Sequence, residues 1–173
     1  YIYLASYLFA AIIQIINFLI LIFINIKKPI SSKKTNRPLC DVLLQKNLII
    51  AILAAAVGYS LMSFIMTATP LQIVNVCKLG DSASATVIQW HVIAMFAPSF
   101  FTGTIINSLG NRKVMMIGLF LYAFSISFTI IGQTIEHFWI ALFLCGLGWN
   151  FLYVGGSDII AKSAHPEERA KVQ

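Results

Sequence analysis

An all-α membrane protein with about five transmembrane helices is the fold class that this sequence predicts. The chain of 173 residues is 59% hydrophobic and only 10% charged, whereas a soluble domain carries about a quarter charged residues. The charged positions are separated by uncharged runs long enough for the roughly 20 apolar residues that cross a bilayer. These runs cover 1–26, 47–77, 82–111, 114–135 and 137–157. Helices are expected because lipid offers no partners for backbone N–H and C=O groups, and the sequence lacks the short alternating strands of a barrel.

The first predicted helix covers about residues 2–25. It lacks the basic start and small-residue cleavage site of a secretory signal and is too long for one, so we expect the chain to begin inside a larger protein. Gln14 and Asn17 share one side of this helix, which favours either helix packing or a cavity wall. The following stretch, 27–47, is basic and interrupted by two prolines. We interpret it as a cytoplasmic linker.

The second predicted helix covers about residues 48–69, and Pro70 is expected to end it. One face carries an adaptable, weakly polar stripe at helical spacing, made of Tyr59, Met62, Ser63 and Met66. Such a stripe is typical of helix contacts and is also compatible with a cavity wall. Tyr59 is therefore a candidate cavity residue.

The third predicted helix covers about residues 86–107 and carries Gln89, Trp90 and His91 near its outer end. Trp90 is explained as an anchor at the membrane interface. An ionisable side chain inside a span is costly and usually faces a bundle interior or a water-filled cavity. His91 is thus either a structural histidine with its hydrogen bonds satisfied or a cavity residue that titrates near physiological pH. Gln89 is a second cavity candidate.

The fourth predicted helix covers about residues 114–133. Small and weakly polar side chains recur on one of its faces, a pattern typical of close helix packing in membranes. They are Gly118, Tyr122, Ser125, Thr129 and Gly132.

The fifth predicted helix covers about residues 138–160. Its polar side carries Gly146, Asn150, Tyr153 and Ser157, and Gly148 and Gly155 lie on a tight side nearly opposite. Asn150 and Tyr153 are cavity candidates. Asp158 lies towards the cytoplasmic end. It is placed either for an ordinary ion pair with Lys162, four residues later, or for coupling to a proton or a substrate.

The distribution of cations predicts the orientation in the membrane. Eleven of the twelve Lys and Arg residues fall in the first connection, the third connection and the tail, and loops rich in these residues stay cytoplasmic. The two remaining connections together hold only Lys78. The chain is therefore expected to start outside and end in the cytoplasm, with Cys40 inside and Cys77 outside.

Enzyme and nucleic-acid functions find little support in the sequence. The cations are dispersed over loops, without a basic helix or a stacking platform, so no nucleic acid is expected. His91, His137 and His165 have no Cys or carboxylate at metal-ligand spacing. Nucleophile-elbow, phosphate-loop and dinucleotide motifs are missing as well. We predict no enzyme activity, no metal and no cofactor, and expect membrane lipid and a small molecule as partners.

The segment "GTIINSLGNRK", residues 103–113, resembles the loop motif of the major facilitator superfamily, conventionally G-x-x-x-D-R-x-G-R-R. Its glycines and cations are supplied by Gly103, Gly110, Arg112 and Lys113. Asn107 stands where the motif has an acid. The resemblance implies that any gating salt bridge of that acid is weaker or missing here.

Longer stretches look like the seventh to tenth helices of a bacterial group in this superfamily: "MTATPLQ", "IQWHVIAMFAPSFFTG", "GLGWNFLYVGGSD" and "HPEERAKVQ". The resemblance implies a bundle of twelve helices in two halves, of which this chain holds helices six to ten. Residues 1–26 would end the first half, 27–47 would be the linker, and 48–173 would supply four helices of the second half. The missing first half would be a partner within the same protein.

The same resemblance implies secondary active transport of a small solute or drug-like compound by alternating access in the bacterial cytoplasmic (inner) membrane. Protons are a candidate coupling ion. Two alternatives stay open: a membrane sensor that does not transport, and a scaffold subunit of a membrane enzyme.

Overall fold

The computed structural model describes residues 4–24 and 44–163, in two compact units, 1–33 and 34–173. Cys40 and nearly all of the predicted linker lie outside the described residues. In the first unit, α1 (Leu4–Phe23) is one apolar helix with a mean hydropathy of 2.3. Its side chains, including Gln14 and Asn17, are exposed within this unit. Its length suffices to cross the hydrocarbon layer of a membrane.

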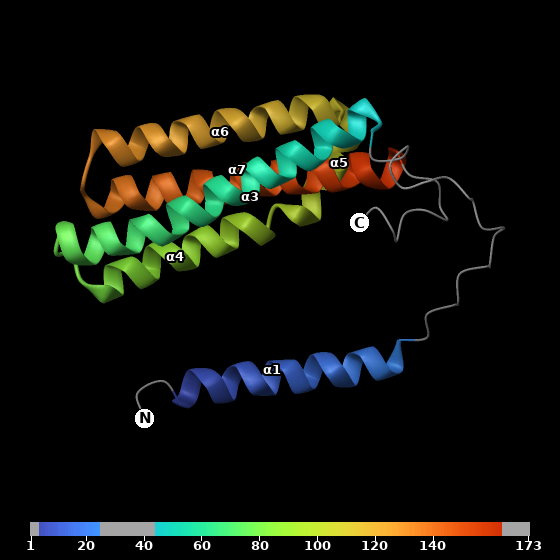
Figure 1. Ribbon diagram of the computed structural model, residues 1–173. Helices are drawn as coiled ribbons and strands as arrows, with labels where there is room; N and C mark the ends of the chain where they lie inside the picture. Colours follow the sequence, from blue (N-terminus) through green and yellow to red (C-terminus); the bar gives the residue numbers. More distant parts are fainter. Residues whose placement is uncertain (1–3, 25–43, 164–173) are drawn as a thin grey trace. The chain divides into compact units, whose positions relative to one another are not determined.

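The second unit consists of helices that run side by side (Figure 1). They are α3 (Lys46–Leu71) with a π-helical turn (Gln72–Val76), α4 (Asp81–Phe96), α5 (Ser99–Leu109), α6 (Asn111–Ile131) and α7 (Ile135–Ser163). With α1, four helices are long and apolar enough to span a membrane, and α4 with α5 makes a fifth span bent by 45°. The predicted all-α membrane fold is confirmed for the described residues.

The expectation that Pro70 ends the second span is wrong. Pro70 lies inside α3, and the helical path continues through the π-helical turn to Val76. Proline has no backbone N–H, so it cannot donate the hydrogen bond that a helical residue normally makes to the carbonyl four positions earlier. The wider turn restores bonding beyond it, since the N–H of Cys77 donates to the carbonyl of Gln72 over 2.9 Å. The span is therefore longer than the sequence predicted.

The third span is broken in the middle rather than continuous. α4 ends at Phe96, α5 begins at Ser99, and the two helix axes differ in direction by 45°. Pro98 lies at the break, where it has no N–H to donate to the preceding turn. Backbone carbonyls near the break are thereby free to accept bonds from other helices.

α7 is the central helix of the second unit and packs against α3, α4 and α6. Three glycines permit these contacts: a Cβ would lie 2.6 Å from the His91 carbonyl at Gly146, 2.9 Å from the Gly118 carbonyl at Gly148, and 3.2 Å from the Ala51 carbonyl at Gly156. Gly146 belongs to the side that the sequence suggested was polar. α7 is therefore tightly packed on several sides, because it is enclosed by three helices.

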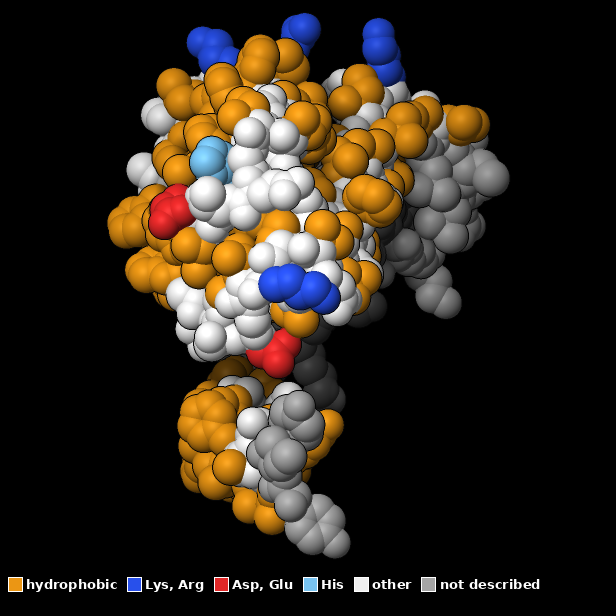
Figure 2. Space-filling model, turned by 90° about the vertical axis from the view of Figure 1, so that its left-hand side faces the viewer, with side chains coloured by type: hydrophobic (Ala, Val, Ile, Leu, Met, Phe, Trp, Pro, Cys, Tyr) orange, Lys and Arg blue, Asp and Glu red, His pale blue; other side chains and the backbone are white. Residues whose placement is uncertain are grey.

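The packing face predicted for the fourth span is confirmed in α6. Gly118, Tyr122 and Ser125 are buried there. The hydroxyl of Tyr122 donates to the carbonyl of Gly58 in α3, and that of Ser125 donates to the carbonyl of Ala141 in α7, each over 2.7 Å. Weakly polar side chains thus join α6 to two helices. On the face that Figure 2 shows, hydrophobic side chains lie beside polar side chains, backbone and a few charged groups. Many large hydrophobic side chains of the described helices are exposed, as expected for a protein solvated by lipid.

Candidate functional site

His91 is completely buried in the contact between α4 and α7. Its Nδ1 lies 2.7 Å from the carbonyl oxygen of Leu142. Because a carbonyl only accepts hydrogen bonds, Nδ1 carries the proton and Nε2 is the acceptor of the ring. Nε2 is buried and has no hydrogen-bond partner among the described residues. The contact with α7 thus satisfies one of the two ring nitrogens of His91 and leaves the other without a hydrogen bond.

Asn150 is also completely buried, and it joins α7 to both sides of the α4–α5 break. Its Nδ2 donates to the Met95 carbonyl over 2.7 Å and to the Ser99 hydroxyl over 2.6 Å. Its Oδ1 accepts from the Thr102 hydroxyl over 2.6 Å. The Asn150 amide therefore bonds one of the backbone carbonyls near the break. In this conformation Asn150 takes part in the contact between helices.

Gln89, Tyr59 and Tyr153 are exposed, unlike His91 and Asn150. The rings of Trp149 and Tyr153 in α7 are parallel, with centroids 4.7 Å apart and an angle of 9° between their planes. Phe96 of α4 meets Trp149 edge-on, with centroids 6.1 Å apart. Tyr153 therefore lies at the open end of an aromatic group that two helices build.

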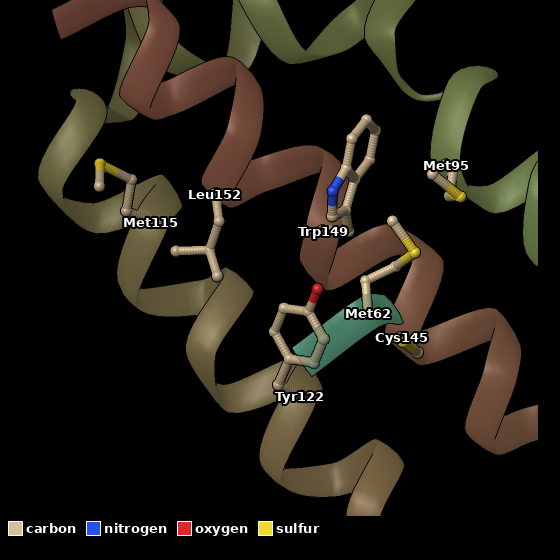
Figure 3. Packing of buried hydrophobic residues seen from close by; sticks show 7 residues of the cluster. All are labelled: Met62, Met95, Met115, Tyr122, Cys145, Trp149 and Leu152. Atoms are coloured by element: carbon tan, nitrogen blue, oxygen red, sulfur yellow. The ribbon is translucent and has the colours of Figure 1, made fainter. Parts of the chain in front are cut away.

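Contacts around Trp149 relate this aromatic group to α3. Met62 of α3 and Met95 of α4 belong to the same buried cluster as Trp149, and Figure 3 shows both methionines near the indole. Tyr59, Ser63 and Met66 share the side of α3 that carries Met62, and Gln89 shares the side of α4 that carries Phe96, by helical periodicity. We call this surface the α3–α4 face; it consists of Tyr59, Met62, Ser63, Met66, Gln89, Phe96, Trp149 and Tyr153.

Another flank of α7 is largely apolar. Trp139 meets Trp90 of α4 edge-on at 5.6 Å and stacks on Phe143 at 5.5 Å. Leu147 and Phe151 continue the flank at four-residue spacing. Polar side chains in membranes usually face protein or water rather than lipid. The α3–α4 face, with its two tyrosines, serine and glutamine, is therefore the better candidate for contact with a solute.

Asp158 forms the ion pair with Lys162 that the sequence predicted, with Nζ 2.5 Å from Oδ2. The same oxygen accepts a hydrogen bond from Nδ2 of Asn111, at the start of α6, over 2.7 Å. Sequence reasoning missed Asn111, because nothing in its immediate neighbours signals a partner 47 residues away. The pair lies near a cavity of about 750 Å³ between α3, α6 and α7, whose lining includes Lys46, Asn111, Arg112 and Ile159.

The loop-motif residues lie where α5 turns into α6. Gly110 has a φ of 84°, a conformation that favours glycine, and its N–H donates to the Ile106 carbonyl over 2.8 Å. Arg112 and Lys113 are exposed just beyond it. The predicted tight turn is confirmed.

Two further motif residues, Gly103 and Asn107, are exposed on α5. A Cβ at Gly103 would meet no atom within 4 Å. Asn107 makes no side-chain hydrogen bond within the described part of the chain, so a gating role for it stays a prediction. Within the described residues, 4–24 and 44–163, no group of three His, Cys, Asp or Glu side chains could hold a metal ion.

The family model of the Major Facilitator Superfamily matches residues 2–173. The riboflavin transporter RfnT of Brucella anthropi is 42% identical over 147 residues, which cover 85% of this chain and 37% of the relative. The uncharacterized MFS-type transporter YddS of Bacillus subtilis is 33% identical over 131 residues, which cover 75% of this chain and 30% of the relative.

A third relative, the multidrug resistance protein MdtL of Shewanella oneidensis, is 24% identical over 121 residues, covering 66% of this chain and 31% of the relative. No solved structure matches the chain significantly. The chain spans 30% to 37% of the length of these three relatives. Since the family model covers nearly every residue and the helices are apolar enough to cross a bilayer, this integral membrane protein belongs to the Major Facilitator Superfamily.

Proposed function

We propose that the chain forms helices six to ten of a twelve-helix secondary transporter, which moves a small solute across the membrane by alternating access. The family match over residues 2–173 carries this proposal, and the transporter names of the relatives support it. Residues 1–26 end the first half, 27–47 link the halves, and 48–173 begin the second. Since the chain spans 37% of RfnT, transport belongs to the whole protein and not to this part alone.

The α3–α4 face forms part of the solute pathway. Its exposed tyrosines and Gln89 offer hydrogen-bonding groups beside aromatic and thioether surface, a combination typical of sites for small organic molecules. His91 and Asn150 lie behind this face, in the contacts that α7 makes with α4 and α5. They hold the helices that present the face, and Nε2 of His91 remains able to accept a proton or a hydrogen bond.

Riboflavin is the first solute to test, because RfnT is named for its transport and is 42% identical to this chain. The full-length protein in lipid vesicles should take up riboflavin faster than empty vesicles, with saturation at high concentration. Drug-like compounds form the second panel, since MdtL is named for multidrug resistance. Failure of the protein to move any solute of either panel, in either direction, would contradict transport.

Proton coupling is part of the proposal and is supported by the buried, unpartnered Nε2 of His91. In the same vesicles, a pH gradient across the membrane should change the steady-state level of accumulated solute, and collapsing the gradient should abolish that change. Accumulation that ignores the gradient would exclude protons as the coupling ion while leaving solute transport intact.

We further place the protein in the bacterial cytoplasmic membrane with α1 entering from outside and α7 ending in the cytoplasm. The exposed cations Arg112 and Lys113, just after the α5–α6 turn, support this orientation. A membrane-impermeant thiol reagent added to intact cells should label Cys77 and spare Cys40. The reverse pattern would invert the topology.

A further inference from the structure

The ring of Tyr153 is held in one orientation, yet much of it is open. It stacks on Trp149 with the ring planes 9° from parallel, and 47% of the residue remains exposed. Trp149 covers one face of the tyrosine ring. A free tyrosine on a helix surface samples several rotamers, and this contact limits them. The outer side of the ring is thus already aligned before any ligand arrives.

Trp149 is itself fixed by side chains from two other helices. Only 8% of the residue is exposed, Phe96 of α4 meets its ring at 70°, and Met62 of α3 packs in the same cluster. Its indole Nε1 is buried and has no hydrogen-bond partner among the described residues. The aromatic group is therefore rigid and also holds an unused donor.

We propose that Tyr153, backed by Trp149, is a stacking platform that selects solutes with a flat, conjugated ring system. This proposal rests on the transport function proposed above and names the class of solute. A flat ring extends the parallel stack of Trp149 and Tyr153 by one layer, and base–aromatic stacking of this kind changes affinity by about 5- to 150-fold. Because the platform is preorganised, little ordering cost is added on binding.

Polar side chains elsewhere on the α3–α4 face indicate which groups at the edge of such a solute could be bonded. Gln89 and the hydroxyl of Tyr59 lie on the same α3–α4 face and can bond carbonyl or ring-nitrogen groups. The second parallel pair in α7, Trp139 and Phe143, has ring planes 13° apart and centroids 5.5 Å apart, and it lies on another flank of α7. That pair is a control for aromatic stacking as such, because its rings are also nearly parallel but do not belong to the α3–α4 face.

The test is equilibrium binding to the purified full-length protein in lipid nanodiscs. The flat-ring probes are riboflavin, adenosine and norfloxacin, and glucose and glutamate are probes without a conjugated ring system. Tyr153→Leu should weaken binding of the flat-ring probe that binds best by about tenfold, whereas Tyr153→Phe, which keeps the ring, and the control Phe143→Leu should change it less than about threefold. Thermal unfolding of each variant verifies that it is folded.

Two results would overturn the platform. One is unchanged flat-ring binding in a folded Tyr153→Leu variant. The other is a wild-type protein that binds none of the three flat-ring probes. If such a protein nevertheless transports glucose, glutamate or another solute without a conjugated ring, the platform fails while the transport function stands. If it transports nothing, the transport function fails as well.

Discussion

Asn150 illustrates how a single polar residue can hold a membrane helix in a bent shape. Three hydrogen bonds of its amide reach Met95, Ser99 and Thr102, on both sides of the α4–α5 break. No water in the hydrocarbon layer can replace these partners, so an unpaired carbonyl there costs free energy. The bend depends on Pro98 to free the backbone and on Asn150 to bond it.

Replacing Asn150 with leucine should therefore destabilise the protein. Asn150→Leu leaves the Met95 carbonyl and the Ser99 hydroxyl without their partner, at a cost of about 1–3 kcal/mol for a buried unsatisfied group. The Thr102 hydroxyl keeps its second bond, to the Pro98 carbonyl. Denaturant unfolding in detergent micelles measures the loss. Ser127→Ala is the control, because Ser127 bonds only the Ala123 carbonyl on an exposed face of α6.

A double-mutant cycle sharpens this prediction. Asn150→Ala and Thr102→Val remove the two ends of one 2.6 Å hydrogen bond. The free energies of unfolding should be non-additive by about 0.5–3 kcal/mol, as found for residues in direct contact. Strict additivity would mean that the bond between Thr102 and Asn150 contributes nothing.

Among the elements, α7 is the helix on which the others are assembled. It contacts α3, α4 and α6, and its glycines let these helices approach so closely that backbone atoms lie opposite one another. Membrane helices lack a strong hydrophobic drive to associate, so close van der Waals packing and a few hydrogen bonds must hold them. The position of the α3–α4 face therefore depends on small residues in α7 as well as on the large apolar side chains that pack between the helices.

Gly146→Ala tests this view of α7. The new Cβ would lie 2.6 Å from the His91 carbonyl and 3.0 Å from Cβ of Ala94, so α4 would have to move. Overpacking of this kind costs about 1–3 kcal/mol. Gly103→Ala is the matched control, since its Cβ would meet open space in α5. A drop in melting temperature for the control as large as that for Gly146→Ala would refute close packing as the cause.

The helices themselves could be predicted, because a sufficiently long run of uncharged, apolar residues is enough to identify a membrane span. The breaks could not, because a proline has no fixed effect in a membrane helix: at Pro70 a π-helical turn continues the path, whereas at Pro98 a bend forms that Asn150 stabilises from a distant part of the chain. Periodicity also grouped Gly146 with the polar side of α7. Its contact with α4 depends on which helix packs there, which the sequence alone does not determine.

The polarity of the candidate residues was enough to find them in the sequence. Whether each one is buried or exposed, and what it contacts, could be determined only from the structure. Gln89 and His91 are two positions apart, yet one is exposed and the other is completely buried, because α7 packs on only one side of α4. The stacking of Tyr153 on Trp149 had no signal beyond their four-residue spacing. The pair of Asp158 and Lys162 was predictable, since it is local to one helix.

For the whole molecule, we propose that the α3–α4 face meets water and solute, while the outer faces meet lipid. Its polar and aromatic side chains on α3, α4 and α7 support this proposal, as does the largely apolar flank of α7 that carries Trp139 and Phe143. Water-soluble reagents distinguish the two environments directly, because a thiol in lipid does not ionise and reacts slowly.

The decisive measurement is therefore thiol labelling of Ser63→Cys in a full-length variant without other cysteines. Ser63 is half-buried on the α3–α4 face, and Phe124→Cys on the exposed apolar surface of α6 is the control. We predict that a charged methanethiosulfonate reagent labels the first and not the second, and that a bound solute slows labelling of the first. If Ser63→Cys reacts no faster than Phe124→Cys from either side of the membrane, the α3–α4 face does not line a solute pathway.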